Sequence, residues 1–144
     1  MDRRLTEFPD RRVWDLSSFT LDQICLDYRT TLLCVALDSS LTIIIGTSFI
    51  YRTGTRVEAM NPEHVLSVTL ILPLLHMQVK SLTAFRSGLL LLVFEDDTSI
   101  EVHKDQQYES WETSGTGEVA NIGMLCSGHN SSPWDKNMSR SQSA

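Results

Sequence analysis

Carboxylate side chains crowd the stretch between residues 95 and 118, and these residues offer the clearest chemistry in the sequence. Lys104 is the only Lys or Arg in this stretch, so we expect a negative field that attracts a basic partner. The alternative is a solvated acidic face that only keeps the protein soluble. We predict a partner-binding set of acids with one aromatic anchor: Glu95, Asp96, Asp97, Glu101, Asp105, Tyr108, Glu109 and Glu112.

The sequence gives little support for a metal site, a phosphate-binding loop or an acid–base catalytic pair. The turn Glu95-Asp96-Asp97 supplies fewer oxygen ligands than a calcium loop does, and the four histidines show no metal-ligand spacing. The segment Gly115-Thr116-Gly117 lacks the Lys and the helix of a phosphate loop. His103 and Asp105 would share one side of a strand, as an acid–base pair requires, but an ordinary exposed strand end is the better interpretation. We therefore expect no enzyme, no metal and no cofactor.

Composition restricts the classes of partner further. The formal net charge of −6 disfavours nucleic acid, which needs a concentrated basic surface. No stretch is long and apolar enough to span a bilayer, and the first twelve residues lack the apolar run of a secretory signal. The three cysteines form no paired set, and Cys25 and Cys34 are expected to be buried, inert thiols. These features predict a cytoplasmic protein with no membrane partner.

The elements that position these residues occur in two similar copies. Tyr28-Arg29-Thr30 and the apolar run after it resemble Phe85-Arg86-Ser87 and the run that follows, at an offset of 57 positions from Arg29 to Arg86. This offset predicts one β-hairpin unit used twice, as pseudo-symmetric halves of a single sheet. The expected hairpins are 32–37 with 41–45 and 89–94 with 98–103, around the turns Asp38-Ser39-Ser40 and Glu95-Asp96-Asp97.

The two hairpins differ in their expected surroundings. Dense apolar and β-branched residues predict that the first is covered on both faces, whereas alternation in the second predicts one wet face. Trp111 is expected to close the core beneath the sheet, although a role in partner binding stays open. Tyr108 fits either role equally well.

A helix is expected between the two repeats. Asn61-Pro62-Glu63 combines an N-cap residue, a first-position proline and an acid in the first turn. Val65, Val68, Leu72 and Leu75 follow at helical spacing, and Pro73 should end the regular part near Leu72. A buried strand from Ser67 to Leu72 is the competing interpretation.

Together these patterns predict an α+β single domain, with a twisted antiparallel sheet built from two related β-hairpin units and one main helix packed on it. Residues 13–134 would form this domain, with the internal repeat at about 24–46 and 81–103. Residues 1–12 would be a polar, Arg-rich segment in which Pro9 discourages regular structure. Residues 135–144 would be a disordered tail, because Ser, Asn and Gly dominate the end of the chain.

Several motifs of the sequence form a recognisable set: Phe94-Glu95-Asp96-Asp97-Thr98, Tyr108-Glu109-x-Trp111-Glu112, the Gly turn, the closing Trp134 and the Asn61-Pro62-Glu63 helix start. Through these motifs the chain resembles a family of small, mostly actinobacterial domains of unknown function. The resemblance covers roughly residues 14–134, although the hairpin turns carry Ser39-Ser40 and Asp96-Asp97 where the family often has Asp-Gly. By analogy in size and style, the resemblance also implies a likeness to immunity proteins of bacterial toxin systems.

These expectations favour a non-enzymatic protein-binding module, most specifically an immunity-type inhibitor whose acidic face covers a basic toxin domain. One alternative is a self-associating structural protein that pairs a sheet edge, so a homo-oligomer is possible. Another is a small-ligand binder with a pocket between sheet and helix, in which Arg29 and Arg86 supply polar groups.

Overall fold

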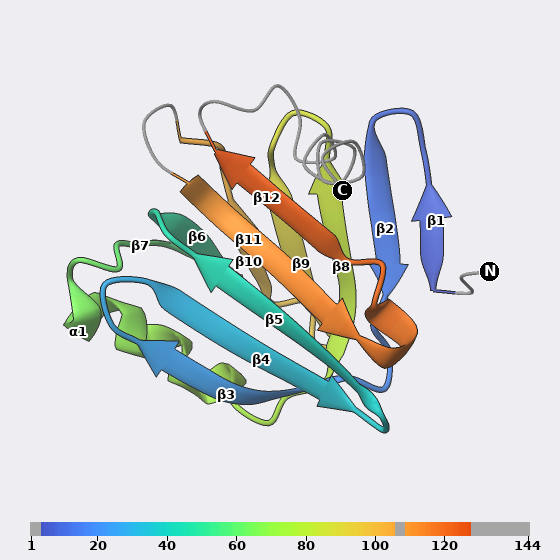
Figure 1. Ribbon diagram of the computed structural model, residues 1–144. Coiled ribbons are helices and arrows are strands. Elements are labelled where there is room, and N and C mark those ends of the chain that lie inside the picture. The colour runs from blue at the N-terminus through green and yellow to red at the C-terminus, as the bar shows by residue number, and fades with distance from the viewer. Residues whose placement is uncertain (1–3, 106–108, 128–144) are drawn as a thin grey trace.

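Two antiparallel sheets lie face to face, and a short helical segment lies near one end of them (Figure 1). The computed structural model describes residues 4–105 and 109–127. In spatial order, the seven-stranded sheet contains β1 (Leu5–Glu7), β2 (Arg11–Asp15), β8 (Val79–Phe85), β9 (Leu90–Phe94), β10 (Ser99–Val102), β6 (Phe49–Thr53) and β7 (Arg56–Met60). The five-stranded sheet contains β12 (Gly123–Ser127), β11 (Glu109–Thr116), β5 (Ser39–Ile45), β4 (Thr30–Ala36) and β3 (Thr20–Leu26). Antiparallel pairing is confirmed, but the predicted single sheet is wrong.

The two segments of the predicted repeat lie in different sheets. Strands β3, β4 and β5 are neighbours in one sheet, and β8, β9 and β10 are neighbours in the other. After each triplet the chain crosses over and adds a hairpin beside the last strand of the other triplet, β6–β7 beside β10 and β11–β12 beside β5. Gly46 lies at one crossing, where an added Cβ would be 2.6 Å from the carbonyl oxygen of Glu109. The constant spacing between the two repeat segments therefore shows that their local strands and turns are similar, but it does not show which strands pair with each other.

The core fills the space between the sheets, and only one face of each strand contributes to it. In β5, Leu41, Ile43 and Ile45 are buried while Thr42 and Ile44 are half-buried. The prediction that the first hairpin is covered on both faces is therefore wrong, since its β-branched residues also occupy the outer face. Trp111 is fully buried, as expected for a core residue.

The amino-terminal residues form strands despite Pro9. Pro9 lies in the turn between β1 and β2, where the Phe8 N–H donates to the Arg11 carbonyl oxygen at 2.8 Å. A proline in a turn removes no hydrogen bond from the ladder, so the expected irregular segment is wrong. The first repeat turn also differs from its prediction, because it consists of Leu37 and Asp38 and β5 begins at Ser39. Asp38 has φ +60°, a conformation that Asp tolerates better than most residues.

The helical segment is much shorter than the predicted main helix. It consists of α1 (Val65–Val68) followed by the 3₁₀ helix η1 (Thr69–Leu74). A second 3₁₀ helix of one turn, η2 (Gly117–Val119), follows β11 and is not part of this segment. The Asn61 Oδ1 atom accepts a hydrogen bond from the Glu63 N–H at 3.0 Å, so Asn61 stabilises a turn and does not cap the helix. Among the described residues, no helix has the length and apolar character needed to cross a membrane.

Candidate binding surface

Four large apolar side chains of the helical segment are exposed. Val68, Ile71 and Leu74 face the core at the three-residue spacing of a 3₁₀ helix, which leaves the intervening residues outside. Leu66 is 86% exposed, and nothing among the described residues covers it. We call this set the apolar helical surface: Val65, Leu66, Leu70 and Leu72.

The acidic turn between β9 and β10 is held firmly by main-chain contacts. The Glu95 N–H donates to the Gln78 carbonyl oxygen at 3.0 Å, and the Asp96 carboxylate accepts from the Thr98 N–H at 3.0 Å. Asp97 adopts φ +68°, and its carboxylate lies 3.4 Å from the exposed Lys80 ammonium. The turn therefore presents three exposed carboxylates, Glu95, Asp96 and Asp97, on a rigid support.

A pocket of about 240 Å³ lies between η1 and the β6–β7 hairpin. Burial and the nearby Asp96 carboxylate raise the pKa of Tyr51, although Arg56 opposes them, so the phenol stays protonated at neutral pH. The Arg56 guanidinium contacts the Glu58 carboxylate at 2.8 Å. Leu70 of the apolar helical surface lines this pocket, and the Asp96 carboxylate of the acidic turn is one of the charges that raise the pKa of Tyr51. The lining of the pocket consists of Tyr51, Thr53, Arg56, Glu58, Leu70 and Pro73.

The remaining acids of the predicted set lie elsewhere. Glu101 projects from the outer face of the seven-stranded sheet, where it contacts Arg52 at 3.4 Å and the His103 ring. Glu109 and Glu112 belong to β11 in the five-stranded sheet. Three of the predicted acids are therefore neighbours at the turn 95–97, while Asp105 lies beside β11.

Two further predicted residues have different outcomes. Asp105 accepts a hydrogen bond from the Thr47 hydroxyl at 3.4 Å, and its N–H donates to Ser110. His103 bonds to Glu101. The structure therefore does not pair His103 with Asp105 as an acid–base couple. Tyr108 lies outside the described residues.

Sequence reasoning missed the apolar helical surface because it expected one main helix that packs its apolar residues on the sheet. Seven of the ten residues from Val65 to Leu74 are Val, Leu or Ile. One face of so short a helix cannot bury that many large side chains. The high number of apolar residues could therefore have indicated that some of them are exposed. Arg56 and Glu58 were missed as well, because the strand β7 that carries them was not predicted.

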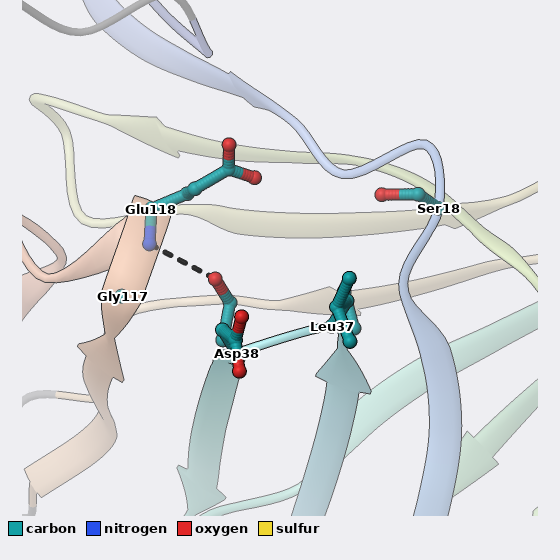
Figure 2. Close-up of a pocket in the computed structure, with 7 residues that line it drawn as sticks. Ser18, Leu37, Asp38, Gly117 and Glu118 are labelled. Atoms are coloured by element: carbon teal, nitrogen blue, oxygen red, sulfur yellow. Dashed lines mark hydrogen bonds between the residues drawn. The ribbon is translucent and has the colours of Figure 1, made fainter.

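A hollow of about 650 Å³ lies at the opposite end of the five-stranded sheet (Figure 2). The turn of Leu37 and Asp38 forms one wall, and Ser18 faces it across the opening in Figure 2. Backbone contacts shape this hollow, since the Glu118 N–H donates to the Ser39 hydroxyl at 2.9 Å. Its lining includes the carboxylates of Asp38 and Glu118, and the Glu118 carboxylate contacts the Arg4 guanidinium at 2.9 Å. No described group of three His, Cys, Asp or Glu residues has metal-binding geometry.

Arg29 and Arg86, the pair expected to converge on a ligand pocket, have separate contacts. The Arg29 guanidinium lies over the Tyr28 ring, 4.9 Å from its centroid. The Arg86 Nε atom donates to the Pro9 carbonyl oxygen at 3.3 Å. Neither side chain lines the pocket beside η1.

The three thiols have different environments. Burial raises the pKa of Cys34 to about 12, and burial also raises the pKa of Cys126 although Lys104 and Ser110 oppose it. Cys25 is exposed on β3, so its predicted burial is wrong. It lies on an edge strand next to a β-bulge between Leu21 and Gln23, which turns this part of the strand outward.

Alkylation of the folded protein with iodoacetamide near pH 8 should therefore modify Cys25 much faster than Cys34 or Cys126. Thiolate is the reactive form, and the two buried thiols are both protonated and inaccessible. Peptide mass spectrometry would measure the three rates, and guanidinium-unfolded protein is the control in which all three should react. Equal rates in the folded protein would contradict the burial of Cys34 and Cys126.

A family model described as a family of unknown function (DUF6188) matches residues 13–128. This range contains both segments of the repeat, the apolar helical surface and the acidic turn. The resemblance to a domain family of unknown function is confirmed. No curated protein and no solved structure matches the chain.

Proposed function

We propose a protein-binding function for this chain, which belongs to the DUF6188 family of unknown function. The observation that carries the proposal is the exposed apolar helical surface of Val65, Leu66, Leu70 and Leu72, and the exposed acidic turn 95–97 supplies negative charge. Half of the eight large apolar side chains exposed among the described residues are in this one segment. Concentrated exposed apolar side chains next to charged residues are typical of protein interaction sites.

The two parts of this surface suit different aspects of binding. Burial of an exposed leucine contributes about 1.5–3 kcal/mol, so the apolar helical surface would supply most of the affinity. The acidic turn is solvated, so its charges would mainly steer a basic partner and raise the association rate. The partner that fits this surface is a protein with an apolar patch bordered by Lys or Arg. The most specific form of the proposal is an immunity-type inhibitor that covers a basic toxin domain.

Capture of the partner from the native cell lysate at low salt should depend on two substitutions in this surface. Leu66→Ser removes the most exposed apolar side chain of the helical segment, and Glu95→Lys reverses an exposed charge whose side chain makes no hydrogen bond or ion pair with another described residue. We expect each to reduce the captured protein at least about tenfold, because Leu66→Ser removes the most exposed apolar contact and Glu95→Lys weakens the negative field that steers a basic partner. Quantitative mass spectrometry of the eluate would measure the loss.

Matched controls separate the surface from general effects. Leu37→Ser removes a leucine that is 88% exposed at the far end of the five-stranded sheet, and Glu109→Lys makes the same charge change on β11. Both controls should retain the wild-type amount of a basic protein that elutes as salt is raised. Equal capture by all four variants would rule out this surface as the binding site.

The pocket beside η1 supports a second candidate function, the binding of a small ligand. It lies between sheet and helix and combines the neutral Tyr51 phenol, the Thr53 hydroxyl and the Arg56–Glu58 pair with the apolar side chains of Leu70 and Pro73. Such a mixture suits a small molecule with both apolar and hydrogen-bonding groups. Failure to capture any protein would favour this candidate over the first.

A further inference from the structure

Strand β7 ends the seven-stranded sheet without the protections that the other sheet edges carry. β1 has three residues, β3 contains a β-bulge and bonds to residues 76–78 at its start, and β12 pairs with a bulged part of β11. β7 instead pairs with β6 over five consecutive residues without a register shift, and it contains neither Pro nor Lys. Charged side chains such as Arg56 and Glu58 can also protect an edge, but without a bulge, a proline or a lysine the backbone groups of β7 stay available to a strand whose charges are complementary.

The hairpin geometry shows which backbone groups of β7 face outward. Thr53 and Arg56 are paired across the two-residue turn Gly54-Thr55, so they form a hydrogen-bonded pair. Hydrogen-bonded and non-hydrogen-bonded pairs then alternate along the hairpin, which directs the N–H and C=O groups of Val57 and Ala59 away from β6. Among the described residues no backbone hydrogen bond to these outward groups is found, and the Val57 side chain is 59% exposed.

We propose that two copies of this chain pair their β7 strands antiparallel, centred on Val57, to join the seven-stranded sheets of both protomers across a two-fold axis. In this register Val57 lies opposite Val57 of the second copy, and Arg56 of each copy lies opposite Glu58 of the other. Each Arg56 also contacts the Glu58 of its own copy at 2.8 Å. In the pair of strands, each of the four charges therefore has neighbours of opposite sign both within its own strand and across the axis. Residues opposite each other in a non-hydrogen-bonded pair have close side chains, so these cross-strand ion pairs are well placed.

Charge complementarity selects this register over the two others that use the same outward groups. Pairing centred on Glu58 would place Glu58 directly opposite Glu58, which is unfavourable. Pairing centred on Ala59 would place Arg56 opposite Pro62, beyond the end of β7, and would leave Glu58 opposite Met60. The sequence Arg-Val-Glu is thus complementary to itself only around Val57.

The test is the mass in solution, measured by sedimentation over concentrations from micromolar to near-millimolar. The wild type should be a concentration-dependent dimer. Val57→Pro should be a monomer, because Pro removes the outward N–H needed by the second copy while no hydrogen bond to β6 is lost. A wild type that stays monomeric throughout, or a folded Val57→Pro variant that stays dimeric, would overturn the proposal.

A charge-swap experiment tests the register and does not depend on how Val57→Pro folds. Arg56→Glu and Glu58→Arg each place like charges opposite each other, so each alone should raise the dissociation constant at least about tenfold. An equimolar mixture of the two variants restores opposite charges and should form a heterodimer, and the double variant should dimerise like the wild type. Folded single variants whose mixture stays monomeric would overturn the Val57-centred register.

Val57 lies outside both the apolar helical surface and the acidic turn, although its neighbours Arg56 and Glu58 line the pocket beside η1. Leu66→Ser and Glu95→Lys should leave the dimer unchanged, and Val57→Pro should leave capture of a heterologous partner unchanged. Failure of one proposal is therefore distinguishable from failure of the other.

Discussion

Replacement of Gly117 by alanine should lower the free energy of unfolding by about 3 kcal/mol or more, one of the largest effects expected from a single methyl group in this chain. Gly117 has φ +65°, and a left-handed conformation costs a non-glycine residue about 1–3 kcal/mol. An added Cβ would also lie 2.2 Å from the Asp38 carbonyl oxygen and 2.5 Å from the Ser39 hydroxyl. Both atoms belong to the β4–β5 turn region, so η2 and this turn could not keep their present contact.

Gly54→Ala is the matched control. Gly54 also has positive φ, at +46°, but its added Cβ would have no neighbour within 4 Å. We expect only the backbone cost there, about 1 kcal/mol. Urea unfolding of both variants, analysed with a common m-value, measures the difference that steric overlap adds. Equal destabilisation would show that the β4–β5 turn moves away from residue 117 at little cost.

Local hairpin patterns predicted much of the strand content, because they depend on neighbouring residues. The second hairpin and its turn Glu95-Asp96-Asp97 occur close to where the apolar runs and acids placed them. Pairing between distant strands depends on tertiary contacts, which produce no comparable pattern in the sequence. The chain crosses to the other sheet at Gly46, before β6, and its backbone there lies close to the backbone of Glu109. A single glycine in the sequence does not show that such a close contact exists.

The helical segment shows why the candidate surface was only half predicted. Acids in the turn 95–97 were identified because exposed charge is visible from composition alone. The exposure of Leu66 and Leu72 depends on how η1 winds, and Pro73 lies within that 3₁₀ segment. An α-helical spacing would have buried Leu72, whereas the 3₁₀ spacing buries Ile71 and Leu74. Apolar content therefore predicted burial for residues that the observed helix type turns outward.

Trp111→Phe is expected to destabilise the protein by about 2–4 kcal/mol. Trp111 extends from β11 in the five-stranded sheet, and its indole N–H donates to the Gly88 carbonyl oxygen, at 2.8 Å, in the turn before β9 of the seven-stranded sheet. The bond therefore joins the two sheets within the core. Phenylalanine would leave space behind, and would leave that buried carbonyl oxygen with only the weak Cys126 thiol contact at 3.6 Å.

Trp14→Phe separates the lost hydrogen bond from the lost volume. Trp14 is as deeply buried as Trp111, at 1% exposure each, so the same substitution removes the same atoms from the core. Its indole N–H, however, donates at 3.2 Å to the side chain of Asn121, an exposed residue that can bond to water instead. We expect about 1–2 kcal/mol for Trp14→Phe, measured by the same urea unfolding. A cost for Trp14→Phe equal to that for Trp111→Phe would mean that volume alone sets both, and that the Gly88 carbonyl does not depend on Trp111. A larger cost for Trp111→Phe would identify the indole-to-carbonyl bond as a specific link between the two sheets.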